Sequence, residues 1–218
     1  MTLYAPPKAQ LAVLHADDFL LVIDKPSGLL SVPGRGLDKA DCASARVQAV
    51  FPDALTVHRL DMATSGLLLF ARSKEVQRAL SGQFARGEVE KRYIADVWGV
   101  PEPASGEIDL PLITDWPRRP LQKVDWEIGK PSVTHYETSS VYGPSARLVL
   151  TPLTGRSHQL RVHLAEIGHP ILGDEFYAHP GALSARARLA LHASALSFVH
   201  PGTGAKVRLE SPCPFEPT

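Results

Sequence analysis

A run of six apolar or small residues, 66–71, directly follows a short polar segment, residues 58–65. A continuous apolar run of this length predicts a buried β-strand. The preceding residues 55–57 also favour a strand, so we expect residues 58–65 to form a loop held between two strands. Functional side chains concentrate on loops that a rigid scaffold positions. This loop places a cation, a carboxylate and two hydroxyl groups close together.

An ordinary solvated hairpin connection is the simplest interpretation of residues 58–65. However, the segment contains few residues typical of tight turns, and only Gly66 at its end is a turn former. It also differs from a protein-kinase catalytic loop, which reads His-Arg-Asp. Here Leu60 separates Arg59 from Asp61, and no Asp-Phe-Gly follows. We therefore treat the loop as a candidate functional site.

The composition restricts the classes of function. A chain of 218 residues suits one large domain, or two lobes around one cleft, with a substantial core. The formal net charge is zero, so composition alone does not indicate a strongly basic nucleic-acid-binding protein. No acidic residue lies between Glu137 and Glu166, whereas Arg147, Arg156 and Arg161 do. This distribution is compatible with a locally basic surface on a neutral protein.

The two cysteines, Cys42 and Cys213, lie far apart in sequence and do not form a disulfide framework. We expect free thiols in a reducing compartment. The N-terminus does not resemble a signal peptide, and no apolar run approaches the length of a membrane span. These features predict a cytoplasmic protein.

The other segments predict short elements connected largely as hairpins. We expect strands at residues 11–15, 19–23, 90–99, 133–142, 146–151, 189–198 and 206–209. Three helices are expected, at residues 42–51, after Ser73 as far as Arg86, and after Ser157 as far as Gly168. Their predicted N-caps are Asp41, Ser73 and Ser157. This irregular mixture indicates an α+β fold with a mixed, mostly antiparallel sheet and flanking helices.

Residues 101–131 show weak periodicity and contain Trp116, Arg118 and Arg119 between prolines. Two interpretations remain open here. The aromatic ring and the guanidinium groups could contact RNA, or the segment could be a surface loop with Trp116 tucked in. For His192 we prefer a buried, satisfied histidine to a catalytic role.

The histidines of the third helix do not predict a metal site. His158 and His163 are five residues apart, which is a poor spacing for two ligands on one helical face, and no carboxylate or thiolate completes a set. The phosphate-binding Gly-x-x-x-x-Gly-Lys pattern is also absent there. We expect neither a metal nor another cofactor.

Several motifs together resemble the RluA family of pseudouridine synthases. Residues 58–66 read His-Arg-Leu-Asp-Met-Ala-Thr-Ser-Gly, residues 91–99 follow Lys-x-Tyr-x-Ala-x-Val-x-Gly, and residues 155–161 read Gly-Arg-Ser-His-Gln-Leu-Arg. Residues 25–28, Lys-Pro-Ser-Gly, match a further segment that lies near the active-site cleft in the family. The resemblance extends from Lys25 to Leu209.

The resemblance implies a pseudouridine synthase catalytic fold with a central RNA-binding cleft, and it implies roles for individual residues. Asp61 is expected to be the nucleophile, Tyr93 to pack against the target base, and Arg161 to pair with Asp61. Arg59 is expected to fill the space that a flipped uridine vacates. His58, Lys25 and Thr64 are expected to contact RNA.

The residue types agree with this chemistry. A carboxylate beside an arginine stays ionised and can attack a sugar or a base, or accept a proton. A glycosidase normally needs a second carboxylate as acid, and none is visible near Asp61 in the sequence. A lone aspartate suits a reaction that breaks the C–N bond of uridine and rejoins the same uracil through carbon. The alternatives are a nucleoside hydrolase and a non-catalytic RNA-binding or ribosome-assembly protein on the same fold.

Within the family, the chain most resembles a short, dual-specificity member that modifies an anticodon-loop uridine of some tRNAs and a hairpin uridine of 23S rRNA. Longer members carry an N-terminal S4 RNA-binding module. The catalytic region begins here within the first dozen residues, so we expect residues 1–218 to be a single catalytic domain without an S4 domain. We expect a monomer whose partners are the tRNA anticodon stem-loop and the 23S rRNA hairpin.

Overall fold

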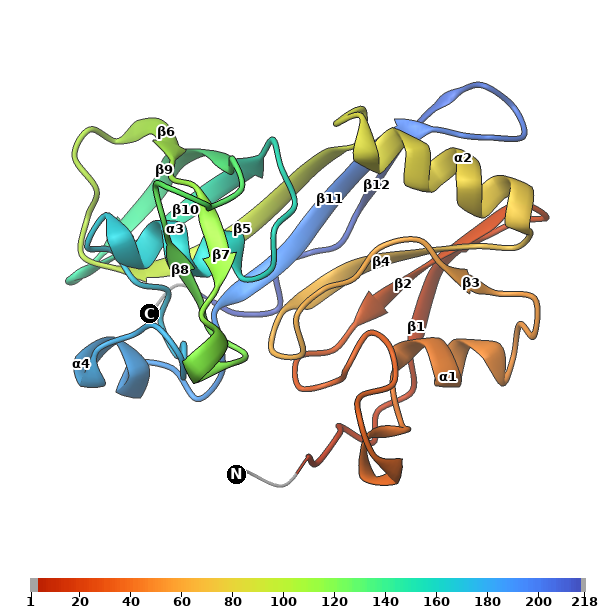
Figure 1. Ribbon diagram of the computed structural model, residues 1–218, viewed down its shortest axis with the longest axis horizontal. Coiled ribbons are helices and arrows are strands. Elements are labelled where there is room, and N and C mark those ends of the chain that lie inside the picture. The colour runs from red at the N-terminus through yellow and green to blue at the C-terminus, as the bar shows by residue number, and fades with distance from the viewer. Residues whose placement is uncertain (1–3, 217–218) are drawn as a thin grey trace. The chain divides into compact units, whose positions relative to one another are not determined.

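A computed structural model describes residues 4–216 of the chain, which divides into two compact units (Figure 1). Unit 1 comprises residues 1–90 and 193–212, and unit 2 comprises residues 91–192 and 213–218. Two strands, β5 and β11, contain a boundary between units. The fold is α+β, as the mixture of predicted elements indicated.

Unit 1 is built on a sheet in the order β1-β2-β4-β11-β12, with β3 paired to β4. The pairs β1–β2, β2–β4, β3–β4 and β11–β12 are antiparallel. The elements are β1 (Ala12–Ala16), β2 (Leu20–Lys25), the short 3-10 helix η1 (Leu37–Lys39), α1 (Ala43–Gln48), β3 (Leu55–Thr56), β4 (Ser65–Ala71), α2 (Lys74–Ala85), β11 (Leu191–Val199) and β12 (Lys206–Glu210).

The core of unit 1 explains the apolar run in the sequence. Every residue of β4 is buried, because the strand lies between β2 and β11 in the sheet. Leu67 and Leu69 pack in a cluster with Val76 and Leu80 of α2. Burying apolar side chains contributes about 0.8 kcal/mol per methylene group, so this strand is a rigid base for the loop that precedes it.

Unit 2 contains the antiparallel sheet β5-β10-β9-β6 and a separate hairpin, β7–β8. Its elements are β5 (Glu90–Trp98), β6 (Ser105–Asp109), β7 (Leu112–Thr114), the 3-10 helix η2 (Trp116–Arg118), β8 (Gln122–Val124), β9 (Val133–Tyr142), β10 (Ser145–Pro152), α3 (Gln159–Glu166) and α4 (Pro180–Ser184). Strand β8 of this hairpin contacts α3, and Figure 1 shows the two elements near each other.

Two predicted helix caps are wrong. The N-cap of α1 is Cys42, whose sulfur accepts a hydrogen bond from the Ala45 amide at 3.4 Å. Asp41 instead forms an ion pair with Arg46 at 2.7 Å. The N-cap of α3 is His158, in a left-handed conformation with φ of 53° and without a side-chain cap. By contrast, Ser73 caps α2 as predicted.

The sequence did not predict β6, β7 and β8 within residues 101–131. These strands have three to five residues each, too few for a periodic pattern to be recognised. The structure excludes the interpretation in which Trp116 is buried, because this side chain is 63% exposed. Contact of this loop with RNA stays a prediction.

The carboxylate of Asp96 in β5 is buried in the interior of unit 2. Its oxygens accept hydrogen bonds from Arg147 at 2.8 Å and from Arg186 at 2.8 Å. Two guanidinium groups thus compensate the loss of hydration of one buried carboxylate. Arg147 also donates to the carbonyl of Phe215 at 2.7 Å, which fixes the C-terminal segment of unit 2.

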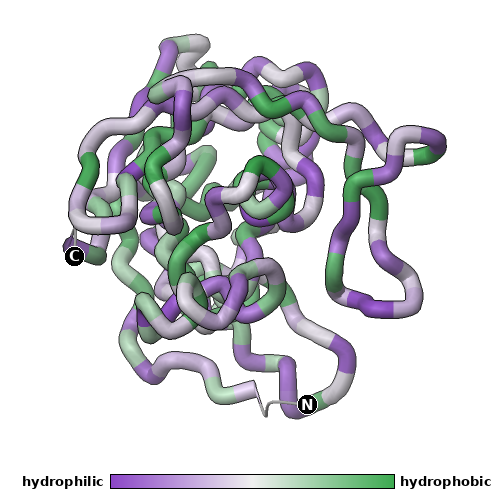
Figure 2. Tube along the Cα trace, turned by 90° about the vertical axis from the view of Figure 1, so that its left-hand side faces the viewer, coloured by the Kyte–Doolittle hydropathy of each residue, from purple (hydrophilic) through white to green (hydrophobic). Residues whose placement is uncertain are grey.

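Both cysteines are free thiols, as predicted. In residues 4–216, no group of three histidine, cysteine or acidic side chains is arranged to hold a metal ion. No helix of the described residues has the length and apolar character needed to cross a membrane. Figure 2 shows hydrophobic and hydrophilic residues interspersed along the same part of the trace.

Candidate active site

The loop that carries Asp61 begins after β3 and ends at β4, as the sequence predicted. Gly66, at its C-terminal end, has a φ of 113°, a region that disfavours residues with a Cβ atom. A Cβ atom at Gly66 would also collide with the backbone of Ala193 in β11. The glycine of this motif is therefore required by the close approach of two strands.

A second segment, residues 25–31, binds the backbone of the Asp61 loop on both sides of the aspartate. On the N-terminal side, the Ser31 hydroxyl donates to the Leu60 carbonyl at 2.7 Å and accepts from the Leu60 amide at 3.0 Å. On the C-terminal side, the Ser27 hydroxyl donates to the Ala63 carbonyl at 2.6 Å. We call these contacts, together with that of Lys25 described next, the clasp.

Lys25 is fully buried, with an exposed fraction of 0%. Its ammonium group donates to the carbonyl oxygens of Leu29 at 2.7 Å, Pro26 at 3.0 Å and Met62 at 3.1 Å. Burial of an ammonium group is costly unless polar partners replace its water. Here backbone carbonyls do so, and one of them belongs to the residue that follows Asp61. The predicted contact of Lys25 with RNA stays a prediction, and it would require the ammonium to leave these carbonyls.

The remaining loop residues differ in their exposure. His58 is fixed, because its Nε2 accepts a hydrogen bond from the Leu69 amide at 3.1 Å and its ring stacks on Phe84 with centroids 4.7 Å apart. Thr64 is buried. Asp61 is half-buried, whereas Arg59 is exposed. Among the predicted RNA-binding side chains, Arg59 thus has the greatest access to solvent.

Unit 2 positions the other two predicted catalytic residues. Tyr93 lies on β5, half-buried, opposite Leu150 of β10. Arg161 lies on α3 and is only 2% exposed. Its guanidinium group binds both carboxylate oxygens of Asp174, with Nε to Oδ2 at 2.7 Å and Nη2 to Oδ1 at 2.5 Å. The predicted pairing of Arg161 with Asp61 stays a prediction.

Aromatic side chains surround the guanidinium group of Arg161. Its Cζ lies 5.0 Å from the ring centroid of Phe176 and 5.2 Å from that of Tyr177. The carboxylate of Asp174 also accepts from the Phe176 amide at 2.9 Å. Two rings and a bidentate carboxylate therefore hold the guanidinium plane in one orientation.

Asp174 and Tyr177 belong to this site but carry no signal in the sequence. A buried arginine is normally paired with a carboxylate. Asp174 supplies it, but this residue lies thirteen positions after Arg161 and outside the motif, so no sequence pattern links the two. Gln159 of the same motif is also buried, and its Nε2 donates a hydrogen bond of 3.0 Å to the carbonyl of Val133 in β9. The motif is thus fastened to β9.

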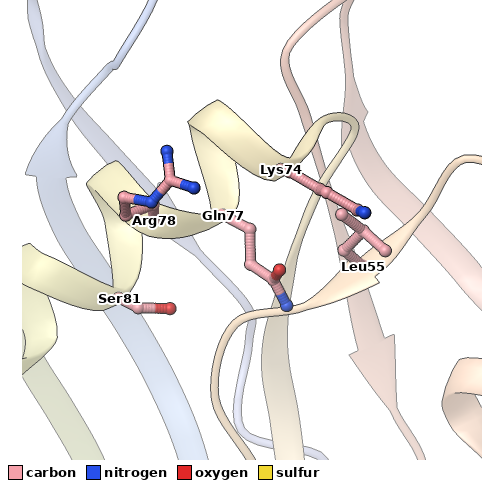
Figure 3. Close-up of a pocket in the computed structure, with 5 residues that line it drawn as sticks. All are labelled: Leu55, Lys74, Gln77, Arg78 and Ser81. Atoms are coloured by element: carbon pink, nitrogen blue, oxygen red, sulfur yellow. The ribbon is translucent and has the colours of Figure 1, made fainter.

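One depression on unit 1 lies apart from the predicted site residues. It has a volume of about 250 Å³ and is lined by Leu55 of β3 and by Lys74, Gln77, Arg78 and Ser81 of α2 (Figure 3). In the figure, the Gln77 side chain points toward β3, where it donates to the Thr56 carbonyl at 2.8 Å. No residue predicted to act in catalysis lines it.

Comparison with known proteins supports the interpretation of the motifs. Residues 19–166 match the family described as RNA pseudouridylate synthase. The dual-specificity RNA pseudouridine synthase RluA of Escherichia coli K12 is 51% identical over 214 residues, covering 97% of this chain and 98% of the relative. The protein of the same name from Vibrio cholerae is 48% identical, covering 100% of this chain and 89% of the relative.

Solved structures agree. Human RNA pseudouridylate synthase domain containing 1 matches with a TM-score of 0.79 and 27% identity, covering 98% of this chain and 88% of the human chain. Human RNA pseudouridylate synthase domain containing 4 matches with a TM-score of 0.75 and 26% identity, covering 93% and 88%. The motifs, the fold and these likenesses lead to one conclusion: the chain belongs to the family of RNA pseudouridylate synthases, which are isomerases that modify RNA.

Proposed function

We propose that this protein isomerises uridines at two kinds of RNA site, an anticodon loop of tRNA and a hairpin of 23S rRNA, with Asp61 as the nucleophile. The observation that supports this role for Asp61 is the set of contacts that we call the clasp. It fixes the backbone carbonyls of Leu60, Met62 and Ala63 but leaves the aspartate half-buried. A nucleophile held by its neighbours in this way needs little reorganisation before it attacks.

The other roles follow from exposure and shape. Arg59 is exposed on the same loop, so its guanidinium can occupy the space left by an extruded base and stack on neighbouring bases. Tyr93 presents a half-buried ring, which is suited to cover one face of the uracil. Arg161 pairs with Asp61 in this proposal and orients that carboxylate, while Asp174 holds the guanidinium group in place.

The reaction is balanced within the nucleotide. The bond between N1 of uracil and C1′ of ribose breaks, and a bond between C5 and the same C1′ forms. The hydrogen on C5 is lost, and N1 gains one. No atom is added overall, so an aspartate that attacks and later leaves is sufficient as a covalent catalyst.

The other predicted RNA-binding residues are less exposed than Arg59. His58 and Thr64 remain candidates, although His58 is stacked on Phe84 and Thr64 is buried. For Lys25 we infer an indirect effect through the loop, because its ammonium faces backbone carbonyls. Of the predicted contacts, Arg59 is therefore the first to test.

The dual choice of substrate is supported by the relatives that cover almost the entire chain, because their name describes a dual-specificity RNA pseudouridine synthase. We infer further that residues 1–218 act as one catalytic domain, as a monomer, in the cytoplasm where tRNA and ribosomes are found. Light scattering of the protein with and without an RNA stem-loop tests the monomer.

The experiment compares wild type, Asp61→Asn and the exposed control Asp18→Asn on unmodified tRNA and 23S rRNA transcripts. Release of tritium from C5 of uridine measures turnover, and chemical labelling with primer extension locates pseudouridine. We expect products at an anticodon-loop uridine and at an rRNA hairpin uridine. Asp61→Asn should reduce turnover on the order of 10⁴-fold or more, as loss of a nucleophile does elsewhere.

Two results would change the proposal. Product on one RNA alone would remove the dual specificity and keep the reaction. Binding of both RNAs by wild type without product would favour a non-catalytic RNA-binding or ribosome-assembly protein on this fold.

A further inference from the structure

The hairpin β7–β8 ends in a loop that exposes a tryptophan and an arginine together. Trp116 is 63% exposed, and the guanidinium carbon of Arg119 lies 4.3 Å from the centroid of its ring. Arg119 also donates from Nε to the carbonyl of Trp116 at 3.3 Å. Within residues 4–216, no carboxylate is paired with Arg119, so the positive charge on this stack is not neutralised by an ion pair.

The loop is stabilised by backbone hydrogen bonds and by an ion pair between two of its residues. The Asp115 amide donates to the Leu121 carbonyl at 2.9 Å, and the Leu121 amide donates to the Arg118 carbonyl at 3.1 Å. Arg118 forms an ion pair of 2.6 Å with the buried carboxylate of Asp115. An exposed ring on a fixed loop loses little conformational freedom when it binds a partner.

Tyr177 ties this loop to the surroundings of Arg161. The amide of Gln122, at the start of β8, donates to the Tyr177 hydroxyl at 2.9 Å. That hydroxyl lies 2.6 Å from Nδ1 of His158, and the ring of Tyr177 faces the guanidinium group of Arg161. The exposed stack is therefore anchored, within unit 2, to the cluster that holds a proposed catalytic arginine.

We infer that Trp116 and Arg119 form a binding surface for an unpaired nucleobase and an adjacent phosphate of the RNA substrate. The inference rests on the proposed function and adds a contact to it. A flat indole accepts any base by stacking, and the guanidinium contributes charge attraction to the phosphate. Loop nucleotides of a structured RNA present such unstacked bases.

A second exposed tryptophan shows what distinguishes this surface. Trp126 is 73% exposed but has acidic neighbours in sequence, Asp125 and Glu127. Asp125 is paired with Lys123 at 3.1 Å, so Glu127 leaves a negative charge next to Trp126, whereas Arg119 places a positive charge on the ring of Trp116. Trp126 is therefore a matched control for the loss of an exposed indole that is not expected to touch RNA.

The test uses the full chain with two RNA probes, an anticodon stem-loop and the 23S rRNA hairpin. The variants are Trp116→Ala, Trp116→Phe, Arg119→Gln and the control Trp126→Ala. Filter binding over a range of salt concentrations gives Kd, and tritium release gives kcat and KM. Quenching of tryptophan fluorescence on RNA binding, compared between wild type and Trp116→Phe, reports stacking on the indole.

We expect Trp116→Ala to raise Kd and KM on the order of ten- to a hundredfold, with the loss in KM rather than in kcat. Trp116→Phe should recover most of the affinity. Arg119→Gln should lower the salt dependence of log Kd by about one ion. Trp126→Ala should match wild type.

Equal Kd values for Trp116→Ala and Trp126→Ala would overturn the inference, and a protein would then be the better candidate for this surface. That result does not affect the proposed function, which is tested separately by product formation on the two RNAs and by its loss in Asp61→Asn. Conversely, the affinity of wild type and Trp116→Ala for RNA can be compared even if no product forms.

Discussion

The ammonium group of Lys25 donates a hydrogen bond of 3.1 Å to the carbonyl of Met62, the residue that follows Asp61. The ammonium group also donates to the carbonyls of Pro26 and Leu29. A neutral chain at this position would leave the carbonyls of Pro26 and Leu29 without the ammonium donor, whereas the Met62 carbonyl would keep a hydrogen bond of 2.9 Å from the Gly28 amide. The contact therefore connects a lysine in one motif with the backbone geometry of another.

Replacement of Lys25 by Met should reduce turnover more than RNA affinity. The carbonyls of Pro26 and Leu29 would lose their ammonium donor. The Met62 carbonyl would be held by the Gly28 amide alone, so the loop around Asp61 would be less restrained. Each unsatisfied buried carbonyl costs about 1–3 kcal/mol, so the melting temperature should also fall. Measurements of kcat, KM and Kd on an anticodon stem-loop check this, with the exposed Lys74→Met as control. A change in Kd alone would indicate direct contact of Lys25 with RNA.

Removal of Asp174 should destabilise the protein strongly. Asp174→Ala leaves the buried guanidinium group of Arg161 without the carboxylate that it binds through two hydrogen bonds. Breaking a buried ion pair in this way costs about 3–5 kcal/mol. Urea unfolding measures the loss. Glu88→Gln, which removes an exposed pair with Arg86, should leave the midpoint unchanged, and equal effects of both variants would contradict the prediction.

Gly66→Ala should be more harmful than Gly143→Ala. Both glycines have a positive φ, 113° at Gly66 and 53° at Gly143, so alanine is strained at either position. The cost is about 1–2 kcal/mol in the left-handed helical region, where Gly143 lies. At Gly66 the new methyl group also meets the backbone of Ala193, whereas the space beside Gly143 is open. Thermal unfolding of both variants separates the collision from the strain. Similar melting temperatures would show that β4 and β11 can separate at little cost.

The stability contributed by Asp17 should depend on pH. Burial raises the pKa of Asp17, but hydrogen bonds from the Phe19 amide and from His15 oppose this effect. The Leu20 amide and His200 add to them, so the pKa lies well below its usual value. A lowered folded-state pKa means that the contribution is complete above the unfolded-state pKa of about 3.9 and is lost as the pH falls below it.

Calorimetry of wild type and Asp17→Asn at several pH values tests this dependence. The variant should melt a few degrees lower at neutral pH, and the difference should shrink as the pH falls below about 4. Asp18→Asn, at an exposed neighbouring position, is the control. A difference that stays constant down to pH 3 would mean that hydrogen-bond geometry, rather than ionisation, determines the effect.

The sequence predicted the elements whose burial is one-sided or complete. The apolar run of β4, the helical stripe of α2 and the β9–β10 hairpin all appear at or near their expected positions. Periodicity reports burial directly, so these elements are encoded locally.

Non-local partners explain the differences. Asp41 is a good N-cap by residue type, but it is bound to Arg46, and Cys42 takes the cap. Asp96 is a charged residue that is buried, because Arg147 and Arg186 from other parts of the chain bind its carboxylate. Such pairings depend on which strands become neighbours, and a single sequence does not state this.

For the site, the motifs indicated which residues to examine but not what holds them. The sequence drew attention to Asp61, Tyr93 and Arg161, whereas Asp174 and the serines of the clasp were found only in the structure. A hydroxyl group that donates to a carbonyl some thirty residues away has no signature in sequence.

The clasp also limits what protein engineering can transfer from this enzyme. Residues 25–31 and 60–63 behave as one two-part unit, joined by hydrogen bonds from Lys25, Ser27 and Ser31. A graft of the aspartate loop alone into another scaffold would carry the reactive group without the backbone order that the first segment imposes. Any minimal catalytic module copied from this protein therefore has to include both segments, together with the strand β4 that follows the loop.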